Sequence, residues 1–404
     1  MKIHRPIYEA LVEALDQCFN QGLYADKIVE QIGKEKSRWG ARDRRQFAEA
    51  LYDIVRWWRR LCFCLDENVF GSKSISTDHF KAIVSLWAEQ KGYSLQGIEP
   101  SLKVNYDLAR WDTANERAVR ESIPDALDEM GARELGDVWE PVLHHLNIQA
   151  SPYLRVNTLK IHPQGLIQEL AKEDVEVDLV PDVSDALKLV QRKNVFITQA
   201  YKKGYFEMQD AGSQLIAPLT AVKSGDRVID ACAGAGGKTL HLAALMKNKG
   251  RIVALDVHEW KLKELKKRAA RAGVDIVETR TIDSTKVIKR LHGTADVVLL
   301  DVPCSGTGTM RRKPDLKWKL TMDEIQRVRG LQMQLLDNYS KMVKDEAGKA
   351  LVYATCSVLP SENEEQVASF LKRSDGRWKL AEEIRVWPHQ TDFDGFYAAR
   401  LERN

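Results

Sequence analysis

The chain has 404 residues, of which 44% are hydrophobic and 29% charged, and its formal net charge is +3. This length exceeds a typical single domain, so we expect more than one domain. No apolar run approaches the roughly 18 residues that a membrane helix requires, and the start, Met1 to Pro6, lacks the apolar segment of a signal peptide. These features argue against a membrane protein and predict a cytoplasmic one.

The cysteines argue against disulfides and against a structural metal. Nothing marks the chain as secreted, so we expect free thiols. Cys62 and Cys64 form a close pair, but no matching second pair completes the four ligands of a zinc site. We therefore expect no metal. The six cysteines are Cys18, Cys62, Cys64, Cys232, Cys304 and Cys356.

Residues 1–135 predict an all-helical domain. Apolar residues recur at helical spacing in Ile7, Leu11, Leu15 and Phe19, while glycine and proline are sparse. This pattern indicates a bundle of five to seven helices.

A basic stretch in this domain suits the phosphates of a nucleic acid. Between residues 31 and 60, nine Lys and Arg residues stand against four Asp and Glu residues. Helical spacing predicts that Arg56, Arg59 and Arg60 share one face, which could bind phosphates. The alternative is that some of these arginines pair with nearby acids or bridge to the C-terminal domain.

Residues 136–210 predict a small α+β domain. Polar and apolar residues alternate in its short segments as they do in half-buried strands, and Pro163–Lys172 has the pattern of a short helix. Strands are expected at Tyr153–Asn157, Val175–Val180, Leu187–Val190 and Gly204–Met208.

Residues 211–404 predict an α/β domain with a doubly wound parallel sheet. Short apolar runs alternate with helical patterns, which is typical of parallel sheets. In such sheets, the loops at the carboxyl ends of the strands carry the chemistry. The expected strands are Arg227–Ile229, Arg251–Leu255, Ile276–Thr281, Val297–Leu300 and Ala350–Tyr353.

A glycine-rich loop, Asp230–Thr239, follows the first of these strands. It is neither a Walker A loop, because Cys232 stands where the first glycine belongs, nor a dinucleotide fingerprint, because Thr239 replaces the last glycine. A turn of this kind still lets backbone approach a nucleotide-like ligand.

Two acidic residues sharpen the prediction of a nucleoside site. Asp256 ends the next strand, where a carboxylate can accept both ribose hydroxyls, and Asp283 follows the strand after it, near an adenine edge. The alternative for Asp256 is an N-cap of the helix Glu259–Ala270. This layout resembles class I S-adenosylmethionine methyltransferases. The predicted cofactor contacts are Cys232, Ala233, Gly234, Ala235, Gly236, Gly237, Lys238, Asp256, Asp283 and Asp301.

Two further loops each carry a cysteine. Asp301–Gly308 reads Asp-Val-Pro-Cys-Ser-Gly-Thr-Gly, and Ala354–Ser357 reads Ala-Thr-Cys-Ser; both follow apolar strand-like runs. We therefore expect Cys304, Cys356 and the carboxylate of Asp301 to converge on one crevice. The polar loop context argues against inert buried thiols. A nucleophilic cysteine beside a nucleotide pocket indicates an enzyme that forms a covalent intermediate.

Together these motifs resemble the RsmB/Nop/Sun family of RNA 5-methylcytosine methyltransferases. Met208–Ser213 and Asp394–Arg403 also match, so the resemblance spans about half of the chain. One departure is Gly234-Ala235, where many members have Ala-Pro. The resemblance implies a Rossmann-like catalytic domain, S-adenosylmethionine as cofactor and RNA as partner, and we expect a monomer. Trp39–Phe47 and Tyr52–Trp57 resemble a NusB-like domain, which favours ribosomal RNA and leaves transfer RNA open.

The resemblance also implies roles for single residues. Cys356 is the nucleophile that adds to carbon 6 of cytosine, and Cys304 assists release of the covalent adduct. Asp301 contacts the cytosine and the cofactor region, and Lys238 helps to position either group. Four residues in the segments expected to meet RNA are Arg155, Asn157, Arg311 and Arg312. For Arg155 and Asn157, the alternative is exposed strand positions without a partner.

Three rival functions remain. A DNA cytosine methyltransferase would use Cys304 of its Pro-Cys motif as nucleophile, but Cys356 would then be idle, and no large DNA-recognition segment follows. An amino-group methyltransferase needs Asn/Asp-Pro-Pro-Tyr/Phe, which Asp301–Cys304 does not match. An RNA-binding scaffold with a vestigial cofactor fold does not require the intact Cys304, Cys356, Asp256 and Asp301.

Overall fold

The computed structural model describes residues 2–98 and 102–404, which form two compact units. The first contains the chain through Ile148 together with Met310–Met322, and the second contains Gln149–Thr309 and Asp323–Asn404. The domain boundaries predicted at residues 135 and 210 stay predictions. Within the described residues, no helix combines the length and the hydrophobicity needed to cross a membrane.

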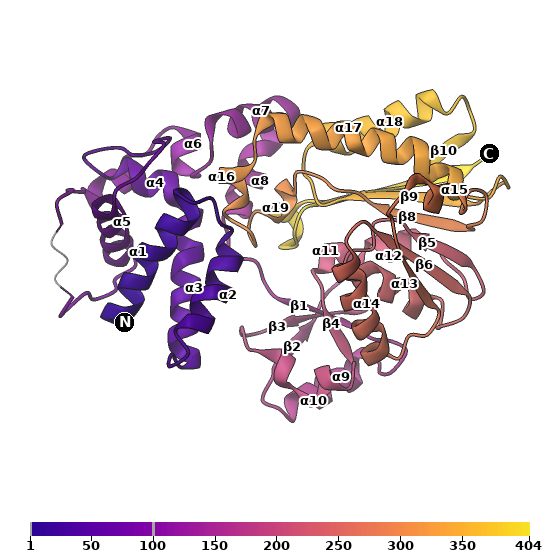
Figure 1. Ribbon diagram of the computed structural model, residues 1–404, viewed down its shortest axis with the longest axis horizontal. Helices are drawn as coiled ribbons and strands as arrows, with labels where there is room; N and C mark the ends of the chain where they lie inside the picture. The colour runs from indigo at the N-terminus through magenta and orange to yellow at the C-terminus, as the bar shows by residue number, and fades with distance from the viewer. Residues whose placement is uncertain (1, 99–101) are drawn as a thin grey trace. The chain divides into compact units, whose positions relative to one another are not determined.

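The first unit is helical, as predicted (Figure 1). Ile7, Leu11 and Leu15 are buried in its core, and the ring of Phe19 stacks on Trp58 with centroids 3.7 Å apart. Its helices are α1 (Arg5–Phe19), α2 (Ala25–Glu35), α3 (Ala41–Arg56), α4 (Trp58–Phe63), α5 (Thr77–Gln90), α6 (Arg117–Arg120), α7 (Asp125–Leu135), α8 (Trp139–Leu146) and α16 (Leu316–Lys319).

The segment Met310–Met322 is built into this helical unit although it lies far along the chain. Asp315 is buried, and its Oδ2 accepts a hydrogen bond of 3.0 Å from the backbone N–H of Ala25, the first residue of α2. A side-chain acceptor at a helix start stabilises that helix. The indole N–H of Trp318 donates to the Val55 carbonyl over 2.7 Å. The amino-acid sequence did not predict that Met310–Met322 would belong to the helical unit.

The second unit contains a small antiparallel sheet in the order β2-β3-β1-β4. This confirms the predicted α+β fold, because β1 (Tyr153–Val156), β2 (Val177–Leu179), β3 (Ala186–Leu189) and β4 (Phe206–Met208) lie within the expected segments, give or take a residue. The helices that accompany it are α9 (Pro163–Ala171) and α10 (Gln199–Lys202).

The large sheet of this unit has seven strands in the order β10-β11-β9-β8-β5-β6-β7. Five strands are parallel and confirm the prediction: β5 (Arg227–Asp230), β6 (Arg251–Asp256), β7 (Val277–Thr281), β8 (Val297–Asp301) and β9 (Ala350–Thr355). At one edge, β10 (Trp378–Val386) and β11 (Phe396–Arg403) run antiparallel, so the sheet is not parallel throughout. The short connection between them cannot make the crossover that a parallel pair needs.

Helices cover both faces of the large sheet, as Figure 1 shows. Successive residues of β5 point to opposite faces. Val228 packs in a core with Leu240 of α13, whereas Ile229 packs in a second core with Leu336 of α17. The helices of this domain are α11 (Ala211–Gln214), α12 (Ile216–Leu219), α13 (Gly237–Leu245), α14 (Glu259–Ala272), α15 (Thr285–Lys289), α17 (Met322–Tyr339), α18 (Glu364–Arg373) and α19 (Pro388–Thr391).

Candidate active site

The glycine-rich loop leaves β5 and is fastened to both neighbouring strands. The Ala231 N–H donates to a carbonyl of β8 and the Ala233 N–H to a carbonyl of β6, each over 2.8 Å. Gly236 has a φ of 87°, and a Cβ there would lie 2.5 Å from the Cγ of Leu265. Only glycine fits this position without strain. The loop therefore enters α13 at Gly237 in one defined conformation.

Asp256 at the end of β6 braces this loop. Its Oδ2 accepts the Gly234 N–H over 2.9 Å, and its Oδ1 accepts the His258 N–H over 2.8 Å. Each carboxylate oxygen can accept a further hydrogen bond. The helix α14 begins at Glu259 with His258, not Asp256, as its N-cap residue. The loop and Asp256 thus fit a nucleoside with ribose hydroxyls.

Asp283 lies in the loop after β7 and is exposed. Its Oδ1 accepts a hydrogen bond of 3.1 Å from the hydroxyl of Ser284. The contact of Asp283 with a cofactor stays a prediction.

Lys238 and Asp301 join the glycine-rich loop to the end of β8. Lys238 Nζ lies 2.7 Å from Asp301 Oδ2. Burial of Lys238 acts to lower its pKa, but the charge and hydrogen bond of Asp301 outweigh burial, so the pKa is raised. Lys238 is therefore a fixed cation at the carboxyl ends of β5 and β8.

The two loop cysteines meet, as the sequence predicts. The Sγ atoms of Cys304 and Cys356 are 3.3 Å apart, because β8 and β9 are parallel neighbours with Asp301 opposite Ala354. The hydrogen bond with Cys356 and burial raise the pKa of Cys304 well above the usual value of a thiol. Two adjacent thiols resist losing both protons. Cys304 therefore stays a thiol beside Cys356.

Cys232 is in a different electrostatic setting. Burial and the nearby carboxylates of Asp301, Asp230 and Asp256 raise its pKa well above that of a free thiol. A protonated thiol is a poor nucleophile. This agrees with the expectation that Cys232 contributes backbone rather than thiol chemistry.

Two buried carboxylates near the site have no counterpart in the predicted site residues. Burial raises the pKa of Asp230 to about 7, and the Thr239 hydroxyl donates to its Oδ2 over 2.6 Å. Glu362 lies six residues after Cys356 and is fully buried. Asp230 is the first residue of the glycine-rich loop, and this position is a signal from which the sequence could have predicted a role in the site. No pattern in the sequence singles out Glu362.

The prediction that Arg155 and Asn157 contact RNA needs correction. Arg155 is 3% exposed and donates to Gln209 Oε1 and to the Gly237 carbonyl. Burial lowers its pKa to about 10. The amide of Asn157 donates to the carbonyls of Gly204 and Ala272, each over 2.8 Å. Both side chains are committed within the protein, and Arg155 supports the glycine-rich loop.

The predicted exposed arginine face is also corrected. α3 ends at Arg56 and α4 starts at Trp58, so the three arginines do not follow one continuous helix. Arg56 and Arg59 are 6% and 8% exposed; Arg56 donates to the Arg311 carbonyl over 3.0 Å, and Arg59 donates to the Ile123 carbonyl over 2.7 Å. Arg60 is partly buried and donates to carbonyls of Trp111 and Arg120.

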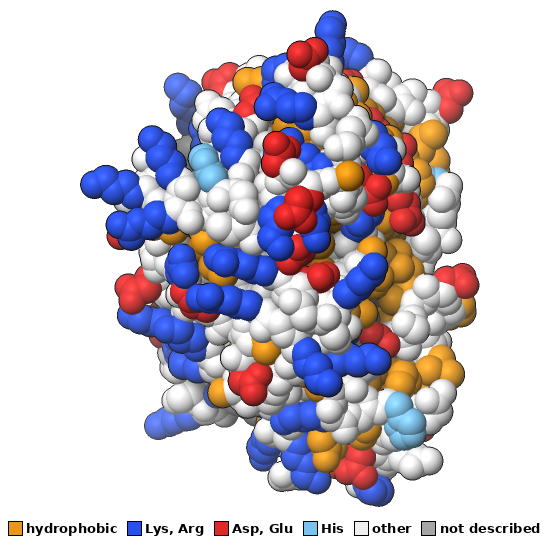
Figure 2. Space-filling view, turned by 90° about the vertical axis from the view of Figure 1, so that its right-hand side faces the viewer, with side chains coloured by type: hydrophobic (Ala, Val, Ile, Leu, Met, Phe, Trp, Pro, Cys, Tyr) orange, Lys and Arg blue, Asp and Glu red, His pale blue; other side chains and the backbone are white. Residues whose placement is uncertain are grey.

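The second predicted basic pair is similarly placed. Arg311 is buried, and its Nε donates to the Ile148 carbonyl over 3.3 Å, whereas Arg312 is half-buried. On the face shown in Figure 2, Lys and Arg side chains are widely spread with acidic side chains between them.

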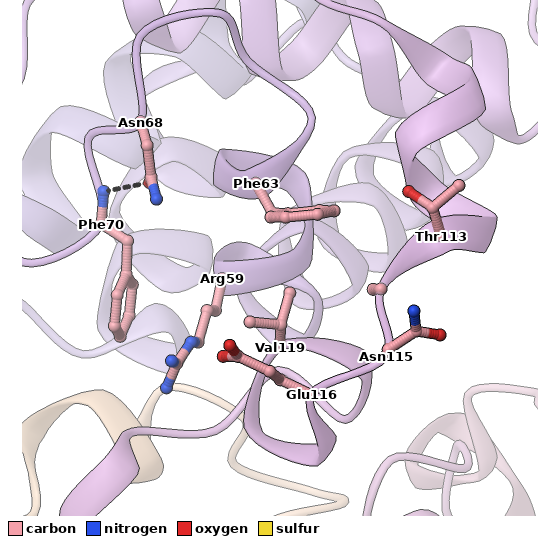
Figure 3. Close-up of a pocket in the computed structure, with 9 residues that line it drawn as sticks. Arg59, Phe63, Asn68, Phe70, Thr113, Asn115, Glu116 and Val119 are labelled. Carbon is pink, nitrogen blue, oxygen red and sulfur yellow. Dashed lines mark hydrogen bonds between the residues drawn. The ribbon is translucent and has the colours of Figure 1, made fainter.

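A cavity of about 360 Å³ lies in the helical unit (Figure 3). The guanidinium of Arg59 lies 4.7 Å from the ring centroid of Phe70 at its wall. Neither Cys304 nor Cys356 lines it, so this cavity is not the site of the cysteine chemistry. Its lining residues are Arg59, Phe63, Asn68, Phe70, Thr113, Ala114, Asn115, Glu116 and Val119.

Comparison with known proteins identifies the family. The sequence model of the family "16S rRNA methyltransferase RsmB/F" matches residues 217–402. The sequence model of a ferredoxin-like domain of RsmF/B-like methyltransferases matches residues 124–196. A probable ribosomal RNA small subunit methyltransferase B of Synechocystis sp. is 30% identical over 94% of this chain and 95% of its own length. The chain belongs to the RsmB/F methyltransferase family. Members of this family depend on S-adenosylmethionine. The carboxylate of Asp256, beside the glycine-rich loop, can accept the ribose hydroxyls of this cofactor.

Two further relatives of the RsmB/F chain agree with this. A probable ribosomal RNA small subunit methyltransferase B of Bacillus subtilis is 34% identical over 62% of the chain, and the match spans 59% of the relative. A methyltransferase homologue of known structure from Pyrococcus horikoshii is 28% identical, with a TM-score of 0.63, over 71% of the chain and 98% of its own length. The matched range of this chain, residues 217–402, includes the glycine-rich loop and both cysteine loops.

Proposed function

We propose that this chain methylates carbon 5 of a cytosine in small-subunit ribosomal RNA. The observation that carries the proposal is the 3.3 Å approach of the Cys304 and Cys356 sulfurs. They lie at the strand ends that also carry the Lys238–Asp301 pair. The names of the relatives support ribosomal RNA as the substrate.

The residues around the glycine-rich loop would hold S-adenosylmethionine. Gly234 to Gly237 present backbone, and Asp256 presents carboxylate oxygens that can accept ribose hydroxyls. When bound, S-adenosylmethionine supplies an electrophilic methyl group.

Cys356 acts as the nucleophile. Carbon 5 of cytosine is a weak nucleophile, and addition of the Cys356 thiolate to carbon 6 makes carbon 5 reactive. The Cys356 sulfur would form a bond to carbon 6, and carbon 5 would take the methyl group. Loss of the carbon 5 proton to water would then restore the ring double bond, break the bond from carbon 6 to sulfur and release Cys356 as a thiolate. The target base must be presented to the pocket in an unstacked form.

Cys304 assists release of the adduct. Its raised pKa keeps it protonated beside Cys356. Its S–H can donate a hydrogen bond to the Cys356 sulfur as that sulfur leaves carbon 6 as a thiolate. The resemblance assigns Asp301 to the cytosine, and Lys238, which pairs with Asp301, is the cation that can stabilise the negative charge that develops on addition.

The position of Cys356 weighs against the DNA-type mechanism. That mechanism uses Cys304 as the nucleophile and leaves Cys356 without a role, although its sulfur lies 3.3 Å from that of Cys304. Transfer RNA remains the alternative polymer for the mechanism with Cys356.

Bisulfite sequencing of total RNA, from cells with and without the gene, tests the proposal. We expect one cytosine of the small-subunit ribosomal RNA to lose its methyl mark in the deletion strain, and expression of the wild-type chain to restore the mark. Loss of a mark only in transfer RNA would change the substrate, and unchanged cytosines throughout would overturn the proposal.

A further inference from the structure

A fully buried carboxylate connects the two cysteine loops. Glu362 is 0% exposed and ends a 3-10 turn, Pro360–Glu362, that follows the Cys356 loop. Its Oε1 accepts the backbone N–H of Ser305 over 2.8 Å and the side-chain amide of Gln332 over 2.9 Å. Its Oε2 accepts the hydroxyl of Ser357 over 2.5 Å and that of Ser305.

These donors come from three separate elements. Ser305 directly follows Cys304, Ser357 directly follows Cys356, and Gln332 belongs to α17. The Gln332 amide also donates to the Pro303 carbonyl over 3.0 Å, on the other side of Cys304. The Glu362 carboxylate thus holds the residue next to each thiol.

The bonding of Glu362 is unusual for a buried acid. In the described part of the chain, no Lys, Arg or His lies within ion-pair distance of its carboxylate, and its four donors are neutral N–H and O–H groups. Burial of a carboxylate without a cation is costly and requires full hydrogen bonding. A well-packed apolar residue would be less costly for stability alone, which points to a role in geometry.

Other contacts also hold the two cysteine loops together. The Gly308 N–H donates to the Cys356 carbonyl over 2.9 Å, and the hydroxyls of Thr307 and Ser357 are 3.0 Å apart. These contacts would remain if Glu362 were lost. Its removal should therefore displace the thiols without unfolding the sheet.

We propose that Glu362 is a positioning residue that sets the separation of the Cys304 and Cys356 sulfurs. The proposed reaction needs both sulfurs at the same base, so this inference rests on the proposed function for its catalytic meaning. The geometric claim itself can be tested without any RNA.

Disulfide trapping reports on the thiol separation through the rate at which the disulfide forms, and all variants are compared at one pH. Oxidised dithiothreitol would accept two electrons and two protons from Cys304 and Cys356 as their disulfide forms. Peptide mapping by mass spectrometry then gives the rate of formation of this disulfide. We expect Glu362→Ala to slow it at least about tenfold, the scale for losing one or two hydrogen bonds to a charged group.

Glu362→Gln is the matched variant. Its amide oxygen can accept the two N–H donors at the Oε1 position, and its NH₂ can donate to the two hydroxyls, which rotate to accept. We expect a trapping rate within about twofold of wild type. Glu365→Ala, at an exposed neighbouring position, should leave the rate unchanged. If Glu362→Ala does not fold, Ser357→Ala removes one donor and should give an intermediate rate.

Steady-state kinetics separate positioning from general damage. Glu362→Ala should lower kcat for methyl transfer at least about tenfold while KM for S-adenosylmethionine stays unchanged, and Glu362→Gln should restore most of kcat. Wild-type trapping rates in both Glu362→Ala and Ser357→Ala would overturn the inference. Failure of the wild-type protein to methylate cytosine would refute the proposed function, yet the trapping experiment would still decide the role of Glu362.

Discussion

Lys238 donates a hydrogen bond to Asp301 over 2.7 Å and thereby ties the first turn of α13 to the end of β8. The first turn of α13 belongs to the cofactor side of the proposed site, and the end of β8 belongs to the cysteine side. A single ion pair therefore links the position of the methyl donor to the position of the base.

We expect Lys238→Met and Asp301→Asn each to reduce methyl transfer strongly, because either change leaves the partner without its counter-charge. In a double-mutant cycle followed by urea unfolding, the coupling between the two residues should be about 1–2 kcal/mol. A coupling near zero would show that the pair is not linked in the folded protein.

Replacement of the two cysteines should give two different defects. Cys356→Ala should abolish transfer of labelled methyl to RNA, because no other group is assigned to carbon 6, while the variant still binds S-adenosylmethionine. Cys304→Ala should accumulate an RNA–protein adduct on denaturing gels, since addition proceeds and release is impaired. The adduct should vanish in the double variant. An adduct in Cys356→Ala instead would reverse the two roles.

Asp256→Ala should weaken binding of S-adenosylmethionine by about 1–3 kcal/mol, the scale for loss of charged hydrogen-bond partners. Part of this effect would come from the Gly234 N–H, which loses its acceptor. Isothermal titration calorimetry measures the change, and Glu259→Ala at the exposed start of α14 serves as a control. Equal affinity of wild type and Asp256→Ala would place ribose recognition elsewhere.

Asp230 should make stability depend on pH. Burial raises its pKa from 3.8 to about 7, so the folded protein keeps the proton over a range in which the unfolded chain releases it. This contribution to stability is full below the unfolded pKa and is lost as pH rises through about 7. Relative to Asp230→Asn, wild type should lose up to about 4 kcal/mol over this range, at 1.36 kcal/mol per pKa unit. Urea unfolding between pH 4 and pH 8 measures it, and parallel curves for the two proteins would contradict it.

Arg59 should matter for the fold of the helical unit rather than for RNA. Arg59→Met loses the bond to the Ile123 carbonyl and the 2.7 Å ion pair with Asp125. We expect a loss of about 2–3 kcal/mol in thermal or urea unfolding, with little effect from the same change at the exposed Arg42. A flatter salt dependence of RNA binding together with unchanged stability would restore the phosphate-binding interpretation.

One physical reason explains why the sequence predicts both the parallel part of the large sheet and the close approach of Cys304 and Cys356. Apolar runs identify the strands, and parallel neighbours bring their carboxyl ends to one edge. Cys304 and Cys356 therefore had to be close once β8 and β9 were placed side by side. The antiparallel edge strand β10 has an irregular pattern of burial, which explains why no apolar alternation revealed it.

The surroundings of charged side chains were the hardest feature to predict from the sequence. The acceptors of Arg155 and Arg60 include backbone carbonyls of Gly237 and Trp111, and a carbonyl leaves no signal in the amino-acid sequence. Glu362 presents the same difficulty, because its partners are a backbone N–H, two hydroxyls and an amide from three elements. Local composition cannot show whether an arginine or a glutamate faces solvent or closes a distant loop.

The segment Met310–Met322 has a consequence for the order in which the protein is made. The start of α2 receives its side-chain acceptor from Asp315, and Val55 receives the indole of Trp318. The ribosome synthesises Asp315 and Trp318 only after strands β1 to β8, which all belong to the second unit. The helical unit, although it comes first in the chain, cannot reach its final packing until those strands have left the ribosome.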